Sequence, residues 1–462
     1  CRRIVERAGC DAQSIAPDDM LCAMNSPVSR FAQTSGHMGG WLILAAILLS
    51  AAHGLGFGLP ATLAGMAFWL AGILLAPRVL GLQRIQTLAM LSVGGAGLLS
   101  AWLSAGQPQL EKALAGNQAL LAMLAGVSFL RLVSLPSVDA DEADPRGPKA
   151  LRRTLLGVHL FGSVINLSAV MILGDRQSRR QAMTPLQASV LSRGFSLAAH
   201  WSPFFAAMGV ALSNSPGADL FTLSTVGLPL AALGLALTAW QLSRRSGARD
   251  YLGYPMHFGA LWIPGLLACL VLLAHQSSPA TPILSLISSL AVSLTLVVLL
   301  LRRASRALPE IRAHVREGLP RMSGELLLFL AAGVLAAGIG SAVQGAGWTL
   351  DLEAFGATEA SLLLLLMVGL SVIGVHPVIS IATAHGLLSP LAPDPNLIGI
   401  TYLMAWAQGV SISPLSGMHL AMQGRFGIDP RGFLRWNRVY TLFMLVLDVG
   451  VLHLYQAWSG WA

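Results

Sequence analysis

Charged side chains are scarce in this sequence. They make up 11% of its 462 residues, and only two of the basic residues, Lys112 and Lys149, are lysines. The formal net charge of +8 comes from arginines in short segments between apolar runs. Because no basic face or nucleic-acid-reading motif accompanies them, we exclude nucleic acid as a partner.

Cysteine is equally scarce, and no catalytic motif is present. The four cysteines, Cys1, Cys10, Cys22 and Cys269, show no metal-ligand spacing. The sequence also lacks a triad motif, paired catalytic carboxylates and a phosphate-binding loop after a strand. Glycines such as Gly94 and Gly97 therefore indicate close helix packing rather than phosphate binding. We predict no enzyme activity, no catalytic residues, no metal site and no cofactor.

The polar N-terminal segment, residues 1–38, has no apolar core of the signal-peptide type. Met20, Met24 and Met38 are alternative starts, so we leave open whether this segment is native and assign it no function.

Hydrophobic residues, in contrast, make up 55% of the chain and form many uninterrupted runs of about 20 residues. Such runs cross a bilayer as helices, because a helix satisfies its own backbone groups. We predict an all-α polytopic membrane protein with about eleven transmembrane helices. The predicted spans are Gly40–Phe57, Leu59–Ala76, Gln86–Ala105, Asn117–Ser134, Gln187–Leu212, Ala218–Leu242, Met256–His275, Pro279–Leu301, Glu325–Gln344, Asn396–Met422 and Trp436–Trp458.

Arginine-rich segments orient these spans, since basic loops stay on the cytoplasmic side. They place the N-terminus in the cytoplasm and the C-terminus outside, most simply in a bacterial inner membrane. The most basic loop is expected at residues 302–321. We expect Arg193, about one turn into its span, to extend its side chain to the cytoplasmic surface.

Two apolar runs do not fit as crossings. Thr154–Gly174 has basic segments at both ends, so it is better explained as a re-entrant hairpin. The number of crossings between Glu359 and Arg425 must be odd, which makes Ala360–Leu391 a second hairpin that enters from outside.

A short pattern occurs twice. Gly157-Val158-His159 precedes Ser202-Pro203, and Gly374-Val375-His376 precedes Ser413-Pro414, at similar distances. With the opposite orientations of the spans, this indicates two inverted-topology repeats with broken helices, a plan typical of secondary transporters. The predicted divisions after the N-terminal segment are scaffold helices (39–116), repeat unit one (117–242), connecting helices with a cytoplasmic loop (243–324) and repeat unit two (325–462).

This order of hairpin, broken helix and closing helix resembles the ion transporter superfamily, most closely its divalent anion:sodium symporter branch. The resemblance implies a site for a carboxylate and its coupling cations at the hairpin tips and helix breaks. It also implies an elevator-type movement against a dimeric scaffold, and hence a homodimer. The family's Ser-Asn-Thr signature is absent: unit one has Ser163, Asn166 and Ser168, and unit two has Ser380, Thr383 and His385.

Proline inside a helix frees backbone carbonyls that a cation can use, and the amides that begin the next half-helix favour an anion. Serine hydroxyls donate and accept hydrogen bonds, and intramembrane histidines are functional candidates. Each histidine could equally be a neutral side chain bonded to a nearby carbonyl. The candidate substrate or ion-binding residues are His159, Ser163, Asn166, His200, Ser202, Pro203, His376, Ser380, Thr383, Ser411, Ser413, Pro414 and Ser416.

His419 and Asp448 are candidates for proton or cation coupling, although Asp448 could instead pair with an arginine. The leading hypothesis is a secondary transporter for a small organic anion, driven by Na⁺ or H⁺. One alternative is an inorganic ion transporter or cation/proton antiporter of the same fold. Another is a polytopic membrane enzyme acting on a lipid-linked substrate.

Overall fold

The computed structural model describes residues 27–104, 106–134, 143–179, 181–256, 258–347 and 354–460. Within these ranges the chain is helical, with one isolated antiparallel bridge between Arg146 and Leu252. The predicted all-α class is therefore confirmed. Cys1, Cys10, Cys22 and most of the polar segment 1–38 lie outside the described residues.

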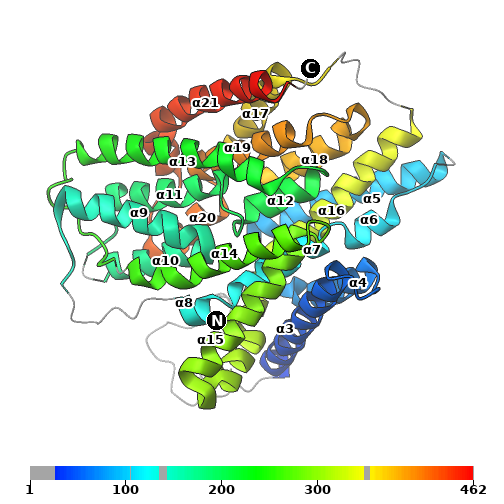
Figure 1. Cartoon of the computed structure of the whole chain (residues 1–462), viewed down its shortest axis with the longest axis horizontal. Coiled ribbons are helices and arrows are strands. Elements are labelled where there is room, and N and C mark those ends of the chain that lie inside the picture. The colour runs from blue at the N-terminus through cyan, green and yellow to red at the C-terminus, as the bar shows by residue number, and fades with distance from the viewer. Residues whose placement is uncertain are drawn as a thin grey trace, which may run out of the picture.

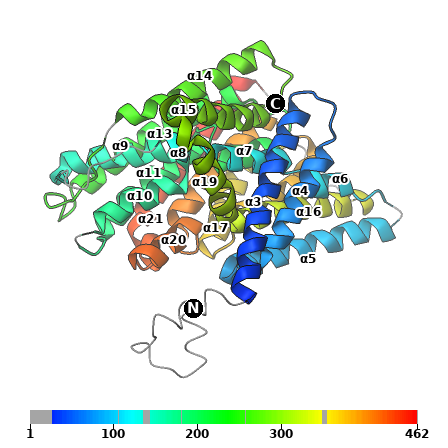
Figure 2. The ribbon, with the colours of Figure 1, turned by 90° about the horizontal axis from the view of Figure 1, so that it is seen from below.

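The first helices form one side of the molecule. They are α3 (Pro27–Gly54), α4 (Ala61–Leu75) with a 3-10 turn at Ala76–Arg78, α5 (Gly81–Leu103) and α6 (Leu110–Ala115). Figure 2 shows them together, beside α16 (Ser323–Gly345). A Cβ on Gly94 of α5 would lie 2.5 Å from the Val334 carbonyl oxygen, and one on Gly97 would lie 2.4 Å from that of Gly338. These two glycines therefore permit close helix packing, as predicted.

The next segment contains the first predicted hairpin and broken helix. After α7 (Gln118–Ser128) and α8 (Arg131–Ser134), helices α9 (Gly147–Ile165) and α10 (Leu167–Gln177) form the hairpin. A capping box at Thr184 and Gln187 then starts α11 (Pro185–Leu197). The broken helix continues as a 3-10 turn at Ala198–His200, an interruption at 201–205 and α12 (Ala206–Asn214), before the long α13 (Leu220–Ser243). The structure thus has a helix-turn-helix and a break around Pro203 where they were expected. That the hairpin is re-entrant stays a prediction.

The connecting region corrects two predictions. A 3-10 turn (Phe258–Leu261) precedes α14 (Trp262–Ser277), so the helix begins six residues after the predicted start at Met256. The basic segment 302–321 is not a loop. Helix α15 (Ile283–Ala313) runs into it across a kink at Arg303 and continues as a π-turn (His314–Gly318) and a 3-10 turn (Leu319–Met322). Arginine and alanine are good helix formers, so the helix continues beyond its apolar residues into the basic segment.

The last segment repeats the same order of elements. Helix α16 is followed by the hairpin of α17 (Ala357–Val372) and α18 (Pro377–Leu388), with a 3-10 turn at Ser389–Leu391. The second broken helix is α19 (Pro395–Ile412) and α20 (Gly417–Phe426), interrupted at 413–416 around Pro414. The long α21 (Arg431–Ser459) closes the segment.

Corresponding helices also have corresponding neighbours. Helix α9 packs on α11 as α17 packs on α19, and α13 packs on α11 as α21 packs on α19. The broken helices α11 and α19 contact each other, as do the closing helices α13 and α21. In Figure 1, α13 and α21 lie side by side at the top of the view. The two segments therefore share element order and packing.

The chain is an integral membrane protein. Seven of its helical stretches are long and apolar enough to cross a membrane, and one of them, Ile283–Gly345, contains two of the predicted spans. Large apolar side chains are exposed along these helices, for example Leu233 on α13 and Val446 on α21. Such faces suit the hydrocarbon of a bilayer. The predicted total of about eleven spans stays a prediction.

The first halves of the two broken helices, α11 and α19, are almost entirely buried. Every residue of α11 from Gln187 to Leu197 is buried, and so is every residue of α19 from Leu397 to Ile412. Parts of the interruptions that follow them, such as Ser202 and Ser413, are buried as well, and buried backbone groups there must find protein or ligand partners.

Candidate functional site

A cavity of about 270 Å³ lies where the hairpin turns and helix interruptions meet. Hairpin one contributes its turn at Ile165, Asn166 and Leu167, and hairpin two contributes His376. The ends of the two interruptions contribute Phe205 and Gly417. Parts of the chain that are more than 200 residues apart in sequence thus form one site.

Four helix N-termini open on this cavity. Helix α10 begins at Leu167, α12 at Ala206, α18 directly after His376, and α20 at Gly417. No side chain caps the N-termini of α10 and α12. Unpaired amides and the positive end of the helix dipole attract anions. The cavity is therefore arranged to bind a negatively charged group.

The local sequence explains both sharp turns. Asn166 has φ = 52°, in the left-handed region, which asparagine tolerates better than most residues. Its amide donates to the Phe204 carbonyl at 3.2 Å and so joins hairpin one to the first interruption. In hairpin two, Gly374 has φ = 102°, and its carbonyl accepts a hydrogen bond of 2.8 Å from Gln86 of α5.

The opposite wall carries charge. Arg131 of α8 lines the cavity, and its Nη1 lies 3.5 Å from the Ser168 hydroxyl on α10. Glu325 of α16 lines it too and is exposed to it. Among the described lining residues, Arg131 is the only lysine or arginine and Glu325 the only carboxylate. Neither forms an ion pair within the described chain, so both charges are available to a ligand.

Sequence reasoning did not place Arg131 or Glu325 in the site. Arg131 is a charge within an apolar run, which is a usable signal, but Glu325 looked like an ordinary span terminus. The same wall contributes Gln83 of α5 and Ser128 of α7. These residues come from helices outside the hairpins and the broken helices, and no local pattern connects them to the hairpins.

Of the predicted site residues, Asn166 and His376 line the cavity. The His376 Nδ1 accepts a hydrogen bond of 3.2 Å from the Val378 amide, and its ring stands edge-on to Trp406. Ser416 adjoins the lining residue Gly417, and its hydroxyl accepts from the His419 amide at 3.3 Å. The predicted residues that do not line the cavity are His159, Ser163, His200, Ser202, Pro203, Ser380, Thr383, Ser411, Ser413, Pro414 and Ser416.

Most of these hydroxyls bond to nearby backbone. Ser163 donates to the Leu160 carbonyl, and Ser411 donates to that of Gln408. The Ser413 hydroxyl accepts from the Leu415 amide. Ser380 is buried and has no hydrogen-bond partner within the described chain. Pro203 lies instead on a separate, mostly apolar cavity beside α13 and α14.

Two of the histidines are bonded at both ring nitrogens. His159 Nδ1 lies 3.1 Å from the Gly194 carbonyl, and its Nε2 accepts from the Trp201 indole at 3.1 Å. His419 Nδ1 lies 2.7 Å from the Ser413 carbonyl, and its Nε2 lies 2.8 Å from the Ser192 hydroxyl. Both have the environment of neutral structural histidines that hold the hairpin and the breaks in place.

Arg193 corrects a prediction. Its side chain does not reach the surface but is fully buried. The guanidinium donates to Asn437, to Gln241 and to the Trp436 carbonyl at 2.8, 2.6 and 2.8 Å, and it lies over the Tyr440 ring. These acceptors come from α13 and α21, so three directed bonds replace water around the charge.

Ser202 offers a test of the site's boundary. Its hydroxyl donates to the Ser163 carbonyl and accepts from the Phe204 amide. Ser202→Ala should therefore reduce the free energy of unfolding by about 1–2 kcal/mol and leave ligand affinity within about twofold. Ser168→Ala, which changes a cavity residue, should instead weaken anion binding and leave the free energy of unfolding nearly unchanged. Thermal unfolding in detergent, with and without a bound anion, measures both the stability and the anion affinity of each variant. If Ser202→Ala weakens anion binding and Ser168→Ala does not, Ser202 belongs to the site and Ser168 does not.

Within the described residues, no group of three or more histidine, cysteine, aspartate or glutamate side chains could hold a metal ion. No family model matches the sequence, and no curated protein matches it. Among solved structures, the chain is similar to the YdaH transporter of Alcanivorax borkumensis, whose crystal structure is described as having an unusual topology. The likeness covers 97% of this chain and 90% of that one, at 14% identity and a TM-score of 0.42.

Proposed function

We propose that the chain is a secondary active transporter that moves a small organic anion, most simply a carboxylate, by elevator-type alternating access coupled to Na⁺ or H⁺. The observation that carries this proposal is the cavity on which four helix N-termini and Arg131 converge. A carboxylate can accept from backbone amides and from a guanidinium in the same site.

The cavity wall favours an organic anion over an inorganic ion. Phe195, Phe205, Phe329 and Trp406 line it together with the polar groups. Apolar walls with a few placed polar groups are typical of small-molecule sites, whereas a bare ion gains nothing from an aromatic surface.

The position of the cavity supports alternating access. One wall comes from α5, α7, α8 and α16, and the other comes from the hairpin turns and broken helices. Movement of one body against the other would open and close the site. The bidentate bond from Arg425 of α20 to Asp175 of α10, at 2.5 and 2.8 Å, supports treating hairpin one and the second broken helix as one body.

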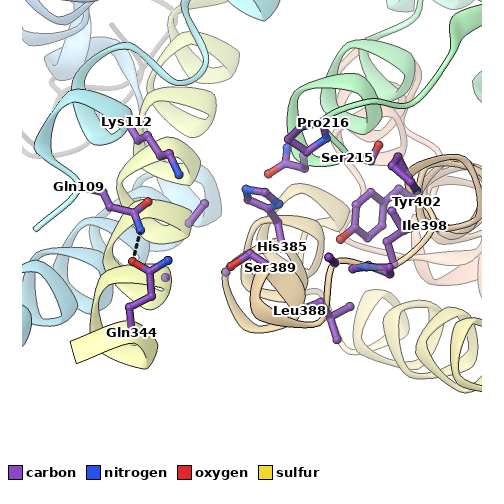
Figure 3. A pocket seen from close by; sticks show the side chains of 17 residues that line it. Gln109, Lys112, Ser215, Pro216, Gln344, His385, Leu388, Ser389, Ile398 and Tyr402 are labelled. Carbon is purple, nitrogen blue, oxygen red and sulfur yellow. Dashed lines mark hydrogen bonds between the residues drawn. The ribbon is translucent and has the colours of Figure 1, made fainter. Parts of the chain in front are cut away.

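A second cavity, of about 370 Å³, supports an opening at the opposite membrane face. The first cavity contacts α16 from Glu325 to Phe329 and the second contacts it from Ala336 to Gln344, so their centres are about 20 Å apart along the helix at 1.5 Å per residue. Figure 3 shows the second cavity between Lys112, Gln109 and Gln344 on one side and His385, Ser389 and Tyr402 on the other. The inverted repeat and the homodimer stay predictions.

The first experiment is thermal stability of the purified chain in detergent, across Na⁺, K⁺, pH, small carboxylates and inorganic anions. A ligand that binds only the native state raises its stability, by about 2.7 kcal/mol at a concentration of 100 Kd. Stabilisation by a carboxylate that increases with Na⁺ or with lower pH supports the proposal. If no carboxylate stabilises the chain at any pH or ionic composition, the proposal fails.

Glu325 gives a sharper prediction for the same cavity. Its carboxylate shares the site with the substrate anion, so Glu325→Gln should remove a repulsion of about 1 kcal/mol and tighten carboxylate binding about fivefold. The measurement is the carboxylate concentration for half-maximal thermal stabilisation. Glu317→Gln, which neutralises an exposed glutamate, is the matched control. Weaker binding by Glu325→Gln would contradict the repulsion.

A further inference from the structure

A buried polar cluster lies beside the two interruptions and outside the anion cavity. It consists of His200, in the 3-10 turn before the first interruption, Gln408 of α19 and Asp448 of α21. All three side chains are at most 1% exposed. Asp448 Oδ2 accepts a hydrogen bond of 2.9 Å from Gln408 Nε2, and Asp448 Oδ1 lies 3.6 Å from His200 Nε2.

Without an added proton, the facing atoms of His200 and Asp448 are both hydrogen-bond acceptors. The other ring nitrogen of His200, Nδ1, lies 3.2 Å from the Leu197 carbonyl and must be the donor there. In a neutral ring, Nε2 is then an acceptor that faces a second acceptor, Asp448 Oδ1. Neither atom has a hydrogen-bond partner within the described chain. Two buried lone pairs that face each other are costly, and one shared proton removes the conflict.

A buried tyrosine connects the cluster with a buried arginine. Tyr440 of α21 interacts electrostatically with both Asp448 and Arg193. Arg193 of α11 supplies the positive charge that interacts with Tyr440, and its guanidinium is already bonded to three acceptors. No arginine pairs with Asp448 within the described chain, so the alternative in which it does is wrong.

We propose that His200 and Asp448 together bind one proton, and that this proton is the coupling ion of the transport cycle. The coupling role rests on the proposed function, whereas the proton site itself does not. With the proton bound, Nε2–H of His200 donates to Asp448 Oδ1 and holds the first interruption against α21. When the proton leaves, the two acceptors repel each other, so the broken helix and α21 separate unless water enters between them.

The test measures proton binding without any substrate. Thermal unfolding of the full chain in detergent is followed from pH 7 to pH 9, and each variant is compared with the wild type. If the native pair holds one proton that the unfolded chain releases, the wild type should lose stability as pH rises, by about tenfold in the unfolding equilibrium constant per pH unit.

Asp448→Asn should abolish this slope, because an amide can donate to His200 Nε2 at every pH. His200→Gln should abolish it as well, which keeps the test decisive if one variant does not fold. Asp250→Asn changes an exposed carboxylate and should keep the wild-type slope. An unchanged slope in both cluster variants overturns the proposal. So does a stabilisation by Na⁺ that Asp448→Asn removes without changing the pH slope, because the cluster would then bind Na⁺.

The same preparations separate this proposal from the proposed function. If the slope depends on Asp448 but no carboxylate stabilises the chain, the proton site stands and the anion site fails. If carboxylates stabilise the chain through Arg131 but the slope is independent of Asp448 and His200, the anion site stands and the proton site fails.

Discussion

Arg131→Gln should weaken carboxylate binding by about 30-fold to 150-fold. Arg131 supplies the only arginine or lysine side chain among the described residues that line the anion cavity, and its described hydrogen bond goes to the Ser168 hydroxyl. A charge-assisted bond between a guanidinium and a carboxylate in a partly closed site is worth about 2–3 kcal/mol. The four helix N-termini remain, so binding should be weakened and not lost. The measurement is the carboxylate concentration that gives half-maximal thermal stabilisation.

The controls separate charge from geometry. Arg131→Lys keeps the positive charge but loses the bidentate geometry, and it should recover part of the affinity. Arg306→Gln neutralises an exposed arginine of α15 and should leave the affinity unchanged. If Arg131→Gln and Arg306→Gln bind the carboxylate equally well, Arg131 is not a ligand of the anion.

Much of the fold could be predicted from sequence because its discontinuities carry local signals. Proline removes a backbone donor, so Pro203 and Pro414 mark the two interruptions wherever the helices pack. Basic segments at both ends of one apolar run indicated the first hairpin. The segment 302–321 was wrongly predicted as a loop because it is rich in charged residues. Arginine is a good helix former, so these residues are compatible with the continuation of α15.

The candidate site was less predictable, because its chemistry depends on which way side chains point. Ser202 adjoins a real interruption, but its hydroxyl bonds to backbone groups that the interruption itself frees. Arg131 and Glu325 reach the cavity from helices outside the hairpins, and their convergence is a property of helix packing. Asn166 was named from its place in the first hairpin, and the structure puts it at the turn, with a positive φ that asparagine tolerates.

Arg193→Met should destabilise the protein by about 3–5 kcal/mol, the largest effect expected of any stability variant here. The buried guanidinium satisfies Asn437, Gln241 and the Trp436 carbonyl. Asn437 in turn donates, at 2.6 Å, to the carbonyl of Ser411, near the end of α19 and just before the second interruption. Methionine fills most of the volume but leaves these acceptors without a donor, at about 1–3 kcal/mol for each unsatisfied group. The loss should therefore exceed that of a deleted methylene group.

The measurement is thermal or denaturant unfolding in detergent, with Arg435→Met as the control. Arg435 lies on α21, two residues from Asn437, but its side chain is exposed, so its loss should change stability by less than about 0.5 kcal/mol. Arg193→Lys keeps the charge and can satisfy fewer of the three acceptors, so it should fall between wild type and Arg193→Met. Equal stability of Arg193→Met and Arg435→Met would mean that the acceptors find other donors. The buried arginine would then not be what holds α11, α13 and α21 around the second interruption.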